Sequence, residues 1–96
     1  PTPERRVLEA VSDYFSVDLE ALTGRRRDKR TALARQIAMF LLKEESRLTL
    51  AAVGRALGGK DHSTVIHACT RINSLLGHDS HLRQDVVNIR RSLSAA

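Results

Sequence analysis

The sequence predicts an all-α domain of about six helices, and three observations support this fold class. Apolar residues recur three or four positions apart along most of the chain, which is the spacing of a helix with one buried face. Threonine or aspartate precedes several of these stretches, as expected of helix N-caps. No segment alternates between apolar and polar residues as a half-buried strand does. The 96 residues are enough for one core, so we expect a single domain over residues 1–96.

The first helix is expected over about residues 3–15, entered through Thr2 and Pro3, because proline suits the first helical position. Residues 17–22 are expected to form a further short turn of helix, which Gly24 ends. The buried stripe of the first helix is expected to consist of Val7, Leu8, Val11, Tyr14 and Phe15.

The longest helix is expected from Thr31 to about Glu45, a stretch without glycine or proline. The segment before it, residues 24–30, is predicted to be a basic loop between helices. The buried stripe of the long helix is expected to consist of Leu33, Ile37, Phe40 and Leu41.

Three more helices are expected in the second half of the chain. Thr49 should cap a short helix that ends at Gly58-Gly59. Asp61 should cap the next, because its carboxylate accepts from the free amides of the first turn and favours the positive end of the helix dipole. Asp79 or Ser80 should cap the last. The residues expected to face the core are Leu50, Val53, Leu57, Val65, Cys69, Ile72, Leu76, Leu82, Val86, Ile89 and Leu93.

The whole chain has a formal net charge of +5, and its positive charge is concentrated in one segment. Residues 1–22 carry five acidic side chains against two arginines, whereas residues 23–36 carry six basic side chains against Asp28 alone. A basic cluster of this kind is typical of a protein that binds a polyanion.

Residues 49–76 fit the helix-turn-helix plan, which is a short helix, a turn with glycine and a second helix. Residues 61–64 are all polar and stand where a major-groove helix presents its base-reading side chains. Each residue alone has a simpler explanation, since aspartate and threonine suit a cap and histidine suits a solvent-exposed surface. Together with the basic loop, they favour DNA binding.

The run from Gly58 to Ala68, with the sequence GGKDHSTVIHA, resembles the signature of the C-terminal DNA-binding domain of the DnaA family of bacterial replication initiators. The resemblance extends to the arginines at 25–27, to residues 34–39 and to the pair at 43–44. It implies a fold of about six helices with a helix-turn-helix motif of the Trp-repressor type.

The resemblance also implies a function: binding of short, asymmetric, AT-rich boxes in double-stranded DNA at the replication origin, by one monomer per box, to initiate chromosome replication. It implies a cytoplasmic, nucleoid-associated protein and no catalysis or cofactor in this domain. ATP is expected on an upstream AAA+ module of the parent chain. Contact between the basic loop and acidic phospholipid is a further expectation.

Carried over to this chain, the resemblance places Asp61, His62 and Ser63 against bases in the major groove. It places Arg27 in the adjacent minor groove, with Arg25 beside it. A carboxylate can accept from the cytosine amino group, and a narrow AT-rich minor groove attracts arginine. The residues expected near phosphates are Arg35, Gln36, Lys43, Leu50, Lys60 and Thr64.

Three positions depart from the usual residue of the family. Ser63 stands where threonine is frequent, which removes a methyl group that would pack on thymine. Lys60 replaces a common arginine, and Ala51 replaces a proline that often opens the short helix. The last two should change affinity more than sequence preference, because phosphate contacts position a protein without reading bases.

Other functions are weaker interpretations. A metal or enzyme site on His62, His67 and Cys69 lacks the i, i+4 spacing that puts two ligands on one helical face. Only three aromatic residues occur, all on expected core stripes, so no stacking platform for single-stranded RNA is predicted. The helix-turn-helix domain of a transcriptional regulator is the remaining alternative, and a partner-binding role for the acidic first helix stays open beside DNA binding.

Overall fold

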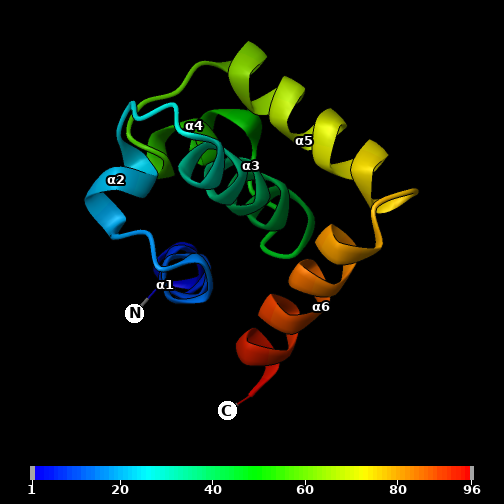
Figure 1. The fold of residues 1–96 in the computed structure, drawn as a ribbon. Coiled ribbons are helices and arrows are strands. Elements are labelled where there is room, and N and C mark those ends of the chain that lie inside the picture. The colour runs from blue at the N-terminus through cyan, green and yellow to red at the C-terminus, as the bar shows by residue number, and fades with distance from the viewer. Residues whose placement is uncertain (1, 96) are drawn as a thin grey trace.

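The computed structural model describes residues 2–95, which form six helices and no strand (Figure 1). This confirms the all-α fold class. The helices are α1 (Pro3–Phe15), α2 (Leu19–Thr23), α3 (Lys29–Glu44), α4 (Leu50–Ala56), α5 (His62–Leu76) and α6 (Ser80–Ser94). No helix in the described part of the chain is long and apolar enough to cross a membrane.

Each helix begins at a side chain that accepts a hydrogen bond from a backbone N–H in its first turn. The caps predicted at Thr49, Asp61 and Asp79 are confirmed. The cap of α3 was missed: Asp28 accepts from the Thr31 N–H at 3.1 Å. The helix therefore begins at Lys29 rather than Thr31, and the basic loop comprises residues 24–28 instead of 24–30.

The central helix is α3, which packs against α1, α2, α4 and α5 (Figure 1). Its side chains Ile37, Leu41 and Leu42 are fully buried. Helix α6 packs on α1 and α5, so the chain closes around α3 from both ends. Burial of these aliphatic side chains supplies the main favourable term, about 1.5–3 kcal/mol for each large one.

The expectation that Tyr14 faces the core is wrong, because its side chain is 37% exposed. Its hydroxyl donates to Asp85 Oδ1 at 2.7 Å and accepts from the Asn88 amide at 3.1 Å, which joins α1 to α6. Because a tyrosine hydroxyl needs a hydrogen-bond partner, Tyr14 lies at the edge of the core, where these two residues supply one. The other two aromatic residues, Phe15 and Phe40, are buried as expected.

Five of the expected core residues are only half-buried, although they pack against the buried cluster. These residues are Leu33, Leu50, Cys69, Leu76 and Leu93.

Glycine is required at two positions around the turn between α4 and α5. A Cβ on Gly54 would lie 2.1 Å from the Lys60 carbonyl oxygen, which is far inside contact distance. Gly58 has a φ of +84°, and a Cβ there would lie 2.1 Å from the Thr23 carbonyl oxygen. The turn therefore packs its backbone directly against both α4 and the end of α2.

Candidate nucleic-acid interface

The start of α5 presents a row of exposed polar side chains. Asp61 accepts from the Thr64 N–H at 2.8 Å, and hydrogen bonds from the backbone and hydroxyl of Thr64 hold the pKa of its carboxyl below the ordinary value. Asp61 is therefore an anion at neutral pH. His62 and Ser63 follow it and are exposed, with no hydrogen-bond partner for either side chain among residues 2–95.

The exposed face of α5 continues beyond the residues that the sequence singled out. Ile66 is 47% exposed, although it is a large apolar residue. It lies one turn after His62 and Ser63, and His67 and Thr70 are exposed on the same helix. The signal that would have found Ile66 is its position outside the buried stripe of Val65, Ala68 and Ile72.

The basic loop presents three exposed arginines at 25–27. Arg26 Nε donates to Asp28 Oδ1 at 3.1 Å, which draws it back toward the cap of α3. Arg27 has no ion-pair or hydrogen-bond partner for its guanidinium among residues 2–95. It is the arginine expected in the minor groove, and its side chain is free to enter one.

Arg35 lies in the interior, 9% exposed, rather than on an open surface. Its guanidinium donates to the carbonyl oxygens of Leu22 at 2.8 Å, Ala21 at 2.9 Å and Arg26 at 2.9 Å. Burial lowers the pKa of this guanidinium, and Asp28 partly offsets the effect. Arg35 thus fastens α2 and the basic loop to α3, a role that the sequence did not indicate. Its contact with phosphate stays a prediction, for which two of its five N–H donors remain.

Lys60 makes a similar link from the turn. Its Nζ donates to the carbonyl oxygens of Thr23 at 3.0 Å and Leu57 at 2.9 Å. Burial, together with the neighbouring charges of Arg35 and Arg25, lowers the pKa of the ammonium. One N–H of the ammonium group remains for an outside acceptor.

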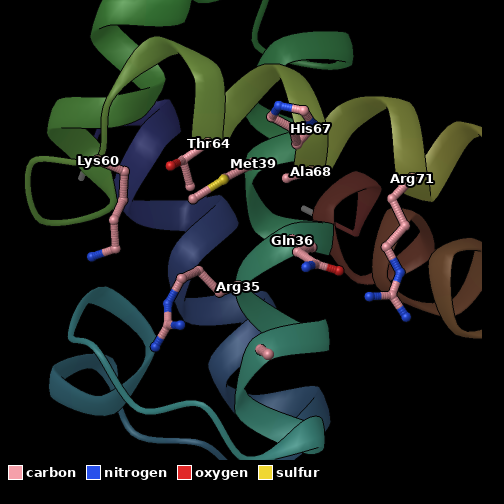
Figure 2. Close-up of a pocket in the computed structure, with 9 residues that line it drawn as sticks. Arg35, Gln36, Met39, Lys60, Thr64, His67, Ala68 and Arg71 are labelled. Carbon is pink, nitrogen blue, oxygen red and sulfur yellow. The ribbon is translucent and has the colours of Figure 1, made fainter.

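A hollow of about 500 Å³ lies between α3 and α5 (Figure 2). Four of the residues expected near phosphates line it, together with His67, which the sequence analysis considered only for a metal site, and Arg71, which it did not name. Figure 2 shows the Arg71 side chain extending from α5 beside Gln36 of α3. The four expected residues are Arg35, Gln36, Lys60 and Thr64.

A second hollow, of about 480 Å³, continues from the first toward the basic loop. Arg27 and Lys29 line its far side, and Arg71, Gln36 and Ala32 line both hollows. A continuous cationic surface therefore connects α5 with the arginine of the loop. An anionic chain is the kind of partner that such a surface attracts.

Two expected phosphate neighbours lie outside these hollows. Lys43 is half-buried in the last turn of α3, where it lines a smaller depression with Glu44 and Arg47. Leu50 is half-buried at the first position of α4 and presents a backbone N–H there.

The residues considered for a metal site are not brought together. No group of three or more histidine, cysteine or acidic side chains within residues 2–95 has the spacing to hold a metal ion. Burial, more than the neighbouring Glu44, raises the pKa of the Cys69 thiol, so it stays protonated and unreactive at neutral pH.

Comparison with known proteins places this arrangement in a family. Residues 5–72 match the family model described as "Bacterial dnaA protein helix-turn-helix". That match covers most of the chain and includes the turn and the start of α5. The chain belongs to this family.

Relatives of the DnaA family agree with the match. The chain is 46% identical over 92 residues to the chromosomal replication initiator protein DnaA of Thermomicrobium roseum, which covers 96% of this chain and 20% of that protein. It is 42% identical over 92 residues to the DnaA protein of Roseiflexus castenholzii, covering 96% of this chain and 19% of that protein. The chain thus spans about a fifth of the length of these relatives.

A solved structure has the same fold. It is the crystal structure of a DNA replication initiation factor, with a TM-score of 0.82 and 30% sequence identity. The similarity covers 93% of this chain and 27% of that chain.

Proposed function

We propose that this chain is the part of a DnaA-type initiator that binds double-stranded DNA in a sequence-specific way. The observation that carries the proposal is the cationic surface that joins the exposed start of α5 to Arg27 of the basic loop. Helix α5 would lie in the major groove with Asp61, His62 and Ser63 against base edges. Arg27, with Arg25 beside it, would enter the adjacent minor groove.

Phosphate contacts would come from the surface around these readers. Thr64, Gln36 and the remaining donors of Lys60 and Arg35 line the hollow between α3 and α5. Lys43 and the N–H at Leu50 would contact the backbone farther out. Contacts of this kind fix register and orientation without reading sequence.

The biological setting follows from the relatives named as chromosomal replication initiator proteins. The target would be short AT-rich boxes at the replication origin, with one monomer on each asymmetric box, in the cytoplasm at the nucleoid. The domain would need no cofactor and would catalyse no reaction, and ATP would bind an AAA+ module elsewhere in the parent chain. The basic loop is also suited to acidic phospholipid.

Selection of random duplexes by the purified domain, followed by sequencing, tests this proposal. We expect one asymmetric AT-rich motif and binding that weakens steeply with salt. A palindromic motif, with sedimentation as a dimer on a single site, would instead favour a transcriptional regulator. Recovery of random sequence would contradict sequence-specific binding.

A further inference from the structure

Arg71 stands between the two elements that are proposed to read DNA. It lies on α5 and lines both the hollow beside Lys60 and the hollow beside Arg27. Figure 2 shows its side chain extending from α5 beside Gln36. The residue is therefore neither at the start of α5 nor in the basic loop, but on the surface that connects them.

The geometry of a DNA duplex determines which part of the DNA would face Arg71. One sugar-phosphate backbone separates a major groove from the adjacent minor groove. A protein that inserts α5 into one groove and Arg27 into the next must straddle that backbone. The surface between the two readers then faces phosphates, and Arg71 is on that surface.

The guanidinium of Arg71 is available for such a contact. No ion pair or side-chain hydrogen bond occupies it among residues 2–95, whereas Arg35 nearby donates to three carbonyl oxygens. Arg71 is exposed, and the small side chains of Ala32 and Ala68 beside it leave the hollow open. An arginine with free N–H groups can hold a phosphate through two parallel hydrogen bonds.

We propose that Arg71 holds the phosphate backbone that runs between the groove read by α5 and the groove entered by Arg27. This inference rests on the proposed function and adds a residue to it. Because phosphate is the same at every base pair, Arg71 contributes affinity for any duplex and no preference among sequences.

The test compares Arg71→Ala with the unaltered domain on an origin-box duplex and on a scrambled duplex of the same composition. Removing one phosphate contact lowers the slope of log affinity against log salt by about 0.9. The loss caused by Arg71→Ala should therefore be about 3.5-fold smaller at roughly 200 mM salt than at roughly 50 mM. The ratio of box to scrambled affinity should not change.

Two further variants make the result specific. Arg91→Ala removes an exposed arginine on α6 that lines neither hollow, and it should leave the salt slope as it was. Arg71→Lys keeps the charge and should keep the slope, while losing the second hydrogen bond to phosphate. Circular dichroism should show the same helix content for all three variants.

Several outcomes would overturn the inference: an unchanged slope for Arg71→Ala, an equal change for Arg91→Ala, or a loss confined to the box duplex. The last would make Arg71 a base-reading residue. If the unaltered domain bound both duplexes alike, the proposed function would fail. A shallower slope for Arg71→Ala on both duplexes would still place Arg71 on phosphate.

Discussion

The start of α5 and the basic loop at 24–28 both present exposed polar side chains, but they are held in opposite ways. At the start of α5, the Asp61 cap and the helix itself set where His62 and Ser63 point. The loop has no regular structure of its own and is fastened by Arg35, a residue of the next helix. One of the two proposed DNA-reading regions is thus placed by local geometry and the other by a tertiary contact, so mutations should affect them differently.

The largest effect is expected from Arg35→Ala. Three carbonyl oxygens of α2 and the loop would lose a charged donor, and hydrogen bonds to charged groups contribute about 1.5–3 kcal/mol each. After partial compensation by water, we expect the free energy of unfolding to fall by about 3 kcal/mol, measured by urea denaturation.

The matched variant is Arg35→Lys, which keeps the charge but lacks the fork that reaches three carbonyls, so it should recover only part of the stability. Arg35→Ala should also lower affinity for box DNA more than for scrambled DNA, because the loop that carries Arg27 is no longer fastened to α3. If Arg35→Ala left the free energy of unfolding unchanged and altered only the salt dependence of DNA binding, Arg35 would act on phosphate alone.

A smaller loss is expected from Gly58→Ala in the turn that links the two regions. This alanine would meet the Thr23 carbonyl oxygen and would also adopt a left-handed conformation, for a loss of about 2–3 kcal/mol in unfolding free energy. Gly59→Ala is the control, because Gly59 has a φ of +89° but nothing within 4 Å of a Cβ. Gly59→Ala should lower the free energy of unfolding only by the conformational strain of about 1–2 kcal/mol. If both variants lost the same amount, the close approach of Gly58 to the Thr23 carbonyl oxygen would not be the cause.

The contrast between local and tertiary contacts also explains what could be predicted from the sequence. Caps such as Thr49 and Asp61 and the apolar spacing of the helices are local patterns, and they predicted the six helices and the start of α5. Asp28 was not predicted as a cap because it stands within the basic run that was expected to be a loop. The start of the long helix was therefore placed two residues late.

The interior position of Arg35 could not be predicted, because its partners lie 9 to 14 residues away along the chain and are backbone oxygens with no sequence signature. Arg71 was missed for a related reason, since its importance comes from two hollows between helices. Tyr14 has the spacing of a core residue, but its hydroxyl donates a hydrogen bond to Asp85 of α6 and its side chain stays partly exposed.

At the start of α5, His62→Ala should change binding and leave folding intact, because the His62 side chain is exposed and makes no hydrogen bond within residues 2–95. We expect a loss of about 1–3 kcal/mol on the box duplex only, measured by fluorescence anisotropy, with scrambled DNA bound as before. His78→Ala, at an exposed histidine beyond the other end of α5, is the control. A similar loss on both duplexes would mean that His62 contacts phosphate rather than bases.

Asp61 combines a cap with a proposed base contact, and pH separates the two roles. Its pKa is lowered in the folded state, so the stability it contributes is present above the unfolded-state pKa of about 3.9 and is lost as pH falls through the folded value. Asp61→Asn keeps an acceptor for the cap but carries no charge. It should remove this part of the pH dependence of the unfolding free energy. Box binding at neutral pH should still weaken; unchanged binding would confine Asp61 to capping.

The smallest effect is expected from Ser63→Thr, which restores the residue that is frequent in the family. Ser63 is exposed in the first turn of α5, so a β-branched residue there costs only a few tenths of a kcal/mol in helix stability. A threonine carries a methyl that can pack on the thymine C5-methyl, and burying one such group contributes about 0.8 kcal/mol. The comparison should use a box with thymine and a box with uracil at the contacted position, because uracil lacks only that methyl. If the side chain at position 63 faces this methyl, the threonine variant loses more affinity on uracil than the serine protein does. Equal losses would place residue 63 away from the thymine methyl, and the local geometry of α5 would then position it for a different base edge.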